Sequence, residues 1–182
     1  MSLYSLLFGP NKIWKQLAED IGGVYEFKDI FSRDKITLTY KQWIIRLDNH
    51  LDYDEDGPYY TRLRVLTSFQ SPLNFEIREH PFINFTLGKK KPFKIGDLII
   101  DKKFVFRSND EKQLKSLFKS HKVYYNFFRV SGDGCFKFRR NVLSYEEVKI
   151  RNVNKLKSLF LMFKRTLDYL DSIDKIKINQ TS

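Results

Sequence analysis

The feature of this sequence that most constrains its fold is a series of short segments in which apolar and polar residues alternate. In residues 36–40, for example, the apolar side chains and the two threonines fall on opposite sides of an extended chain. Strand-like patterns of this kind occupy residues 24–31, 36–40, 43–47, 59–69, 73–78, 83–87, 104–106, 123–130, 135–140 and 142–150. Because no regular series of helices separates these segments, they predict a mainly antiparallel sheet.

Two segments near the ends of the chain have the apolar spacing of amphipathic helices. The first is followed by the stop signal Gly22-Gly23, and the last begins near Asn152. The apolar positions are Ile13, Trp14, Leu17, Ala18 and Ile21 in the first, and Val153, Leu156, Phe160, Phe163, Leu167 and Leu170 in the last. The width of the second stripe predicts that this long helix lies across a sheet or in a groove.

Residues 95–118 combine a turn, a strand and a third helix. Gly96-Asp97 is typical of a turn, and residues 104–106 form a short apolar run. Ser108 precedes Glu111 by three residues, which is the spacing of a capping box at a helix start. The helix that follows places Leu114, Leu117 and Phe118 on one face.

Together these patterns predict an α+β fold with a curved, mainly antiparallel sheet. An N-terminal helix, a short central helix and a long C-terminal helix are expected to pack on it. We expect hairpins across the acidic loop 52–58 and across residues 131–134, where Ser-Gly-Asp-Gly separates two strand patterns. A single domain over 1–174 with a frayed tail over 175–182 is the expected organisation, and two lobes divided near residue 88 are the alternative.

The formal charge of +11 is concentrated in the second half of the chain. Residues 1–87 carry 10 Lys and Arg against 12 Asp and Glu, whereas residues 88–182 carry 23 against 10. Such asymmetry is typical of a surface for nucleic acid, anionic lipid or an acidic protein. A single alanine and an abundance of Lys, Ile, Asn and Phe support a second interpretation, in which an AT-rich genome supplies lysines to ordinary solvated faces.

A candidate surface for a polyanion follows from basic residues that are interleaved with aromatic ones. Its members are Lys89, Lys90, Lys91, Lys94, Lys137, Arg139 and Arg140. In residues 135–139 the phenylalanines share one face of the strand and the basic residues share the other, which is unfavourable for a base-stacking platform. A basic outer face that contacts phosphates alone satisfies the same pattern.

The sequence gives no positive support for an enzyme or a cofactor. Asp52, Asp54 and Asp56 match the opening of a calcium loop, but Leu63 stands where the bidentate Glu is expected, so they offer a weak cation site at most. The three histidines are far apart, and the motifs of phosphate loops, dinucleotide sites and zinc proteases do not occur. A hydrolase whose carboxylates meet only in the folded chain is the alternative.

The chain is expected to be soluble and cytoplasmic. No run approaches the roughly 18 apolar residues of a membrane span, and the first ten residues lack the basic start of a signal peptide. The single Cys135 excludes an internal disulfide and is consistent with a reducing compartment.

One block of the sequence resembles a pattern of bacterial proteins of unknown function. The block comprises Gly96-Asp97, Asp101, Phe104 and Ser108-Asn109-Asp110, with Tyr60-Thr61-Arg62 upstream. It is similar to G-D-x-x-F-D-x-x-F-x-x-x-S-N-D, with Ile100 where the pattern has Phe. The resemblance implies a bacterial α+β domain and transfers no known active site to this chain.

Arg62, Arg64 and Asp101 suggest two alternatives within this block. In the first, Asp101 pairs with one of these guanidinium groups and fixes a strand edge. In the second, Arg62 and Arg64 face a cavity and bind an anionic ligand there.

Taken as a whole, the sequence favours a bacterial binding module that engages an acidic protein or another polyanion, for instance as an inhibitor or immunity-type partner. A nucleic-acid-binding protein that contacts phosphates is the second hypothesis.

Overall fold

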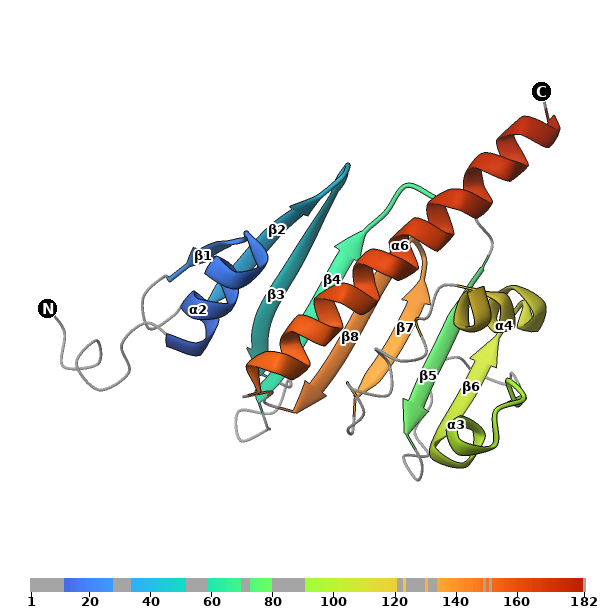
Figure 1. Cartoon of the computed structure of the whole chain (residues 1–182), viewed down its shortest axis with the longest axis horizontal. Helices are drawn as coiled ribbons and strands as arrows, with labels where there is room; N and C mark the ends of the chain where they lie inside the picture. Colours follow the sequence, from blue (N-terminus) through green and yellow to red (C-terminus); the bar gives the residue numbers. More distant parts are fainter. Residues whose placement is uncertain are drawn as a thin grey trace, which may run out of the picture.

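The computed structural model describes residues 12–27, 34–51, 59–69, 73–79, 91–120, 123, 130, 134–148, 150 and 152–181. They contain an eight-stranded sheet with the order β1-β2-β3-β4-β8-β7-β5-β6 (Figure 1), and the paired strands are antiparallel. The strands are β1 (Val24–Glu26), β2 (Lys35–Tyr40), β3 (Trp43–Leu51), β4 (Tyr59–Leu66), β5 (Phe75–Glu79), β6 (Phe104–Ser108), β7 (Cys135–Arg139) and β8 (Val142–Val148). The helices are α2 (Lys12–Ile21), α3 (Leu98–Lys103), α4 (Glu111–Ser120) and α6 (Val153–Thr181). The predicted α+β architecture is confirmed.

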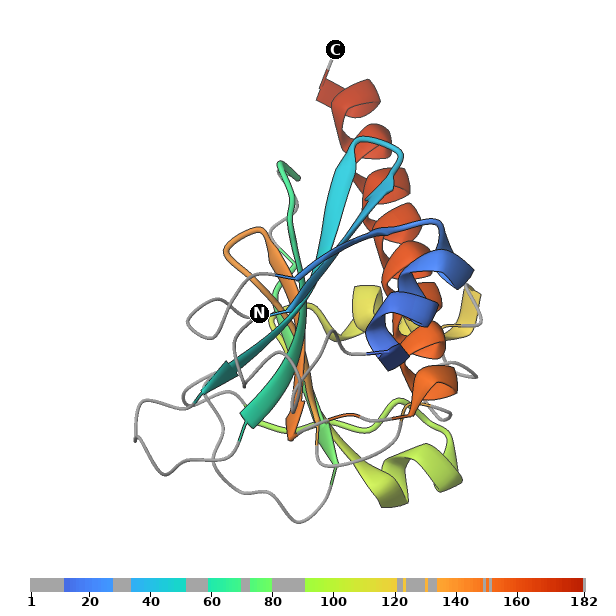
Figure 2. The same cartoon turned by 90° about the vertical axis from the view of Figure 1, so that its left-hand side faces the viewer.

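The helices lie on one side of the sheet, with α6 crossing its middle strands (Figures 1 and 2). The apolar stripe predicted for α6 is buried there, and the rings of Phe163 and Phe136 lie 5.6 Å apart. Asn152 caps the start of α6, because its side-chain oxygen accepts a hydrogen bond from the Lys155 amide at 3.1 Å. The helix continues to Thr181, beyond the point where the sequence places a frayed tail.

The N-terminal helix ends as its glycines predict. Gly22 has a φ of 72°, the Gly23 amide donates to the Ala18 carbonyl at 2.8 Å, and the Gly22 amide donates to Glu19 at 3.3 Å. This pair of hydrogen bonds is a Schellman motif, which favours glycine at the left-handed position. Trp14, Leu17 and Ala18 are buried beneath it.

The capping prediction at the third helix is wrong in its residue. Helix α4 begins at Glu111, and its cap is Asp110, whose carboxylate accepts from the Gln113 amide at 2.9 Å. Ser108 is still part of β6, where its hydroxyl contacts the Asn74 carbonyl and the Asp110 amide. The buried face of α4 is as predicted, since Leu114, Leu117 and Phe118 are all in the core.

The strand predicted over 123–130 is wrong at its two described positions. Val123 and Val130, the two described residues of that stretch, are helical, and β7 pairs with β5 and β8 instead. The hairpin of β7 turns into β8 through Arg140 and Asn141, whose φ values of 50° and 61° are those of a two-residue hairpin turn.

Strands from both sides of residue 88 alternate in the sheet, because β8 and β7 are inserted between β4 and β5. A division into two lobes near residue 88 would separate these paired strands. The strand expected over 83–87 and the acidic loop 52–58 lie outside the described residues, and so does the segment 28–33, which includes the last part of the strand expected over 24–31. Within the described residues, no helix is both long and apolar enough to cross a membrane.

Gly134 is required by close packing against β8. A Cβ atom at this position would overlap the hydroxyl and ring of the buried Tyr145. The Tyr145 hydroxyl also contacts Glu147, which in turn contacts Lys155 of α6, so this ring is held in place. Gly134, just before β7, therefore allows the close packing that positions the β7–β8 hairpin against the start of α6.

We expect Gly134→Ala to destabilise the fold by about 1–3 kcal/mol, because the buried ring has to move to admit the methyl group. Urea unfolding of the variant and the wild type measures the difference. Gly22→Asn is a suitable control, since asparagine tolerates a positive φ and nothing lies within contact distance of a Cβ there. Equal unfolding midpoints for Gly134→Ala and the wild type would contradict this account.

Candidate functional site

The strand alternation sends a set of basic side chains to the face of the sheet opposite the helices, which we call the basic face. Its register is set by the pairing of Arg46 with Arg64, of Arg64 with Ser144 and of Ser144 with Lys137. The basic residues of the five central strands on this face are Arg46, Arg62, Arg64, Arg78, Lys137 and Arg139, and the carboxylates are Asp48, Glu76 and Glu146. No described helix covers this face (Figure 2).

The carboxylates of the basic face neutralise part of this charge. Asp48 accepts from Arg62 at 2.9 Å and lies 3.2 Å from Arg64, so two guanidinium groups share one carboxylate. Glu76 is fully buried and pairs with Arg78 at 2.6 Å. Lys137 lies 3.3 Å from Glu146. Cations therefore outnumber carboxylates among these residues, and Arg140 adds a further cation beside Arg139 at the β7–β8 turn.

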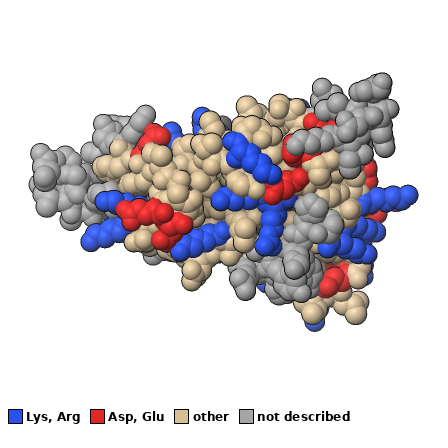
Figure 3. Space-filling view, turned by 45° about the horizontal axis from the view of Figure 1, so that its top comes forward, with Lys and Arg blue, Asp and Glu red and all other residues tan. Residues whose placement is uncertain are grey.

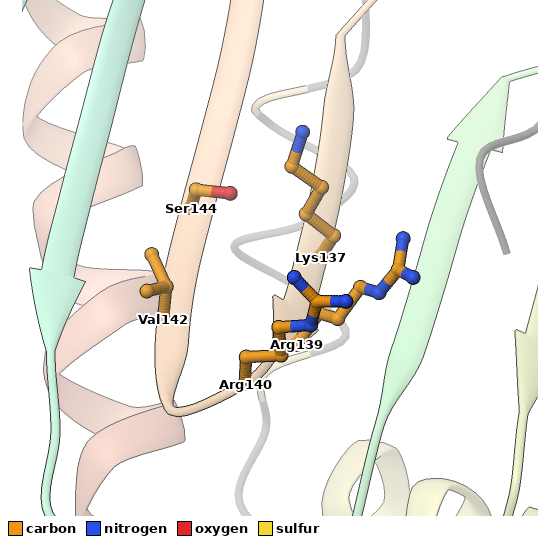
Figure 4. A pocket seen from close by; sticks show the side chains of 5 residues that line it. All are labelled: Lys137, Arg139, Arg140, Val142 and Ser144. Carbon is orange, nitrogen blue, oxygen red and sulfur yellow. The ribbon is translucent and has the colours of Figure 1, made fainter.

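A hollow of about 360 Å³ opens on the basic face beside that turn. Its walls are Lys137, Arg139, Arg140, Val142 and Ser144. Lys137 and Arg139 project from β7, Arg140 projects from the turn, and the other two side chains lie on β8 (Figure 4). We call this hollow the β7–β8 pocket. Its basic side chains could bind an anion by charge-assisted hydrogen bonds.

Among the described residues that line the β7–β8 pocket, Ser144 has the only neutral polar side chain. The residue is 4% exposed, and its hydroxyl has no hydrogen-bond partner among the described residues. Its register neighbours are Arg64 on one side and Lys137 on the other, so it lies between two cations. A buried hydroxyl without a partner costs about 1–3 kcal/mol, which a bound acceptor would offset.

Apolar side chains surround the basic groups on this face. Leu66 is 74% exposed beside Val142, its register partner on β8. Ile44 on β3 and Val148 on β8 are also exposed. The basic face therefore combines charge with accessible apolar area, as the surfaces that bind proteins do.

The helix side of the molecule has a different distribution of charge. Figure 3 shows Lys and Arg interspersed with Asp and Glu on a view that includes this side. Lys41 pairs with Asp168 of α6, and Lys157 of α6 pairs with Asp20 of α2 at 2.7 Å. These pairs stabilise contacts between elements and leave this surface less uniformly basic.

Some of the basic residues that the sequence predicts for a polyanion surface lie together in the structure, and others do not. Lys137, Arg139 and Arg140 meet at the pocket. Lys91 and Lys94 are exposed beside Phe93, which bridges to the edge strand β6, so β5 and β6 separate them from the pocket. Lys89 and Lys90 lie outside the described residues. Sequence reasoning missed Ser144, because only the strand register places it opposite Lys137.

Asp101 does not pair with Arg62 or Arg64, whose carboxylate partner is Asp48. The Asp101 carboxylate instead accepts from the amides of Ile95 and Gly96 at 2.8 and 2.9 Å. It lies within α3, a helix that the sequence analysis did not predict and that Asp97 caps through the amides of Ile99 and Ile100. Two aspartates of the G-D-x-x-x-D block thus hold the turn and helix together, which is a structural role.

Cys135 lies on the basic face but is withdrawn from solvent. Its sulfur is 3.8 Å from a Glu76 carboxylate oxygen, and Arg78 is nearby. Burial raises the pKa of Cys135 to about 11, with the positive charge of Arg78 acting in the opposite direction. The described residues contain no group of His, Cys, Asp and Glu able to hold a metal, and Asp52, Asp54 and Asp56 lie outside them.

No protein-family model matches this sequence, and no curated protein matches it either. Among solved structures, the fold is similar to the crystal structure of the mycobacterial trehalose monomycolate transport factor A, TtfA. The TM-score is 0.57 with 10% sequence identity, over 86% of this chain and 91% of that chain. At this identity the similarity shows a shared fold alone.

We expect Cys135 to alkylate slowly in the folded protein. A rise in its pKa from 9.0 to about 11 lowers the thiolate fraction at pH 8 about 100-fold, and burial hinders access further. Mass spectrometry after iodoacetamide treatment at pH 8 measures the rate, with the guanidinium-unfolded chain as the control. Equal rates in the two states would show that the thiol is neither buried nor raised in pKa.

Proposed function

We propose that this protein is a binding module that engages an acidic protein, or another polyanion, through the basic face. The observation that supports the proposal is the convergence of Lys137, Arg139 and Arg140 on one hollow. It lies on the side of the sheet that the described helices leave uncovered. An inhibitory or immunity-type role, in the cytoplasm of a bacterium, is one form that such binding would take.

Exposed apolar side chains favour a protein partner over a nucleic acid. Leu66, Ile44 and Val148 would lose accessible area to a protein surface, whereas a phosphate backbone offers them little. The phenylalanines of β7 point into the core, so they are not available to stack on bases. Electrostatic attraction would then mainly accelerate association and orient the partner, with apolar contact adding affinity.

We expect Arg139→Glu/Arg140→Asp to abolish most of the binding to an anionic probe. Aspartate suits position 140 because its φ of 50° is one that Asp tolerates better than most residues. With fluorescent poly-L-glutamate in low-salt buffer, the affinity of the variant should fall about tenfold or more, and wild-type binding should weaken with added salt.

The matched control is Lys112→Glu/Lys119→Glu, which makes the same change in net charge on exposed positions of α4. It should retain the wild-type affinity within about twofold. An equal loss of affinity in both variants would mean that the probe responds to net charge alone. That result would contradict binding at the basic face. If the protein binds a DNA duplex site-specifically and more tightly than poly-L-glutamate, with a steep salt dependence, the partner is a nucleic acid and not an acidic protein.

A further inference from the structure

We infer that the β7–β8 pocket is a site for a phosphomonoester group. This inference rests on the proposed function, since it specifies which anion the basic face receives beside the β7–β8 turn. It requires three features of the pocket to act together. These are the local excess of positive charge, the hydroxyl of Ser144, and a lysine that can exchange its partner.

The charge of the pocket fits a dianion better than a monoanion. Arg139 and Arg140 adjoin in sequence, and Lys137 lies two residues away on the same face of β7. Among the described residues, Glu146 forms an ion pair with Lys137, with the ammonium 3.3 Å from the carboxylate. Guanidinium groups bind phosphate oxygens through pairs of parallel hydrogen bonds, and lysine binds them as a point charge. A phosphomonoester carries close to two negative charges at pH 7.

The Ser144 hydroxyl supplies a donor for one phosphate oxygen. It is buried and without a partner among the described residues, and in Figure 4 it points from β8 toward the strand that carries Lys137. A phosphate has three terminal oxygens, so it can accept from a hydroxyl and from cations at the same time. The pocket volume of about 360 Å³ accommodates a phosphate together with a small organic group.

Lys137 is the side chain that would exchange partners on binding. Its ammonium lies 3.3 Å from Glu146, and both side chains are more than a quarter exposed. An ion pair this exposed contributes little stability, so a phosphate can displace the carboxylate. Glu146 therefore competes with the ligand, and its removal is expected to strengthen binding. Among the described residues, the charged register neighbours of these side chains are Arg64 of β4, opposite Ser144, and Glu76 of β5, opposite Lys137.

Two ligands of the same shape test the preference for a dianion. Phenyl phosphate should bind at pH 7.5 at least about tenfold more tightly than phenyl sulfate, which carries a single charge. The affinity for phenyl phosphate should fall as the pH decreases through about 6, where the phosphate gains a proton, whereas that for phenyl sulfate should stay constant. Calorimetric titration measures both. Equal affinities, or no binding of phenyl phosphate, would overturn the inference.

Variants at two positions test the mechanism. Ser144→Ala should weaken phenyl phosphate binding about fivefold or more while leaving the unfolding midpoint unchanged or higher, because it deletes only the unpaired hydroxyl. Ser116→Ala on α4 is the control for the loss of a hydroxyl, and its affinity for phenyl phosphate should equal that of the wild type. Unchanged affinity in Ser144→Ala would mean that the hydroxyl serves the fold alone, which would overturn its assigned role.

Glu146→Gln should tighten binding about two- to fivefold by releasing Lys137. Its matched control is Glu26→Gln, which also removes a carboxylate paired with a lysine, here Lys35 at 3.1 Å on the sheet edge. The control should have little effect. Unchanged or weaker binding in Glu146→Gln, or an equal gain in both variants, would contradict the exchange of partners by Lys137.

The same measurements separate this inference from the proposed function. If Arg139→Glu/Arg140→Asp abolishes binding of poly-L-glutamate but phenyl phosphate does not bind the wild type, the inference fails and the proposed function stands. If phenyl phosphate binds and poly-L-glutamate does not, the β7–β8 pocket is a phosphomonoester site and the proposed binding of polyanions by the basic face is wrong. A phosphotyrosine peptide that binds more tightly than phenyl phosphate identifies a protein as the source of the phosphate, and equal affinity identifies a free ligand.

Discussion

The burial of the apolar stripe of α6 against the centre of the sheet is the interaction on which the rest of this structure depends. The helix crosses the middle strands, and Phe160, Phe163 and Leu167 are in the core. Because a strand exposes alternate residues to opposite faces, covering one face fixes the side of every residue in the paired strands. A shift of one residue in any pairing would place charged side chains beneath α6. The packing of α6 therefore enforces the register that builds the basic face.

The packing of α6 against one face of the sheet also determines which side chains form the basic face on the other. With the phenylalanines of β7 directed toward α6, Lys137 and Arg139 have to point away from it. The neighbouring strands contribute Arg64 and Glu146 in register, so the charges form a two-dimensional array rather than a line along one strand. The tight β7–β8 turn adds Arg140 at the end of this array. The carboxylates reduce the repulsion among these cations without cancelling it, which leaves a surface suited to an anion.

Features that depend on neighbours within a few residues were predictable from the sequence. The alternation of the strands, the Schellman end of α2 and the buried stripes of α4 and α6 all have this local character. The helix cap at residue 110 was misassigned because Ser108 pairs with Phe75 in the sheet, and this non-local pairing occupies the residue before the helix begins. Val123 and Val130 are helical where the sequence predicts a strand, because a short apolar run suits a strand and a buried helix equally well.

For the candidate site, the sequence by itself determined that Lys137 and Arg139 share one face of a strand and that two phenylalanines share the other. Period-two alternation is a property of the extended backbone, so it needs no knowledge of the fold. Only the tertiary structure decided which basic residues meet and what lies between them. The insertion of β8 and β7 between β4 and β5 separates Lys91 and Lys94 from the pocket and places Ser144 between Arg64 and Lys137. Strand order is set by how the whole sheet packs beneath α6, and no local pattern of residues encodes it.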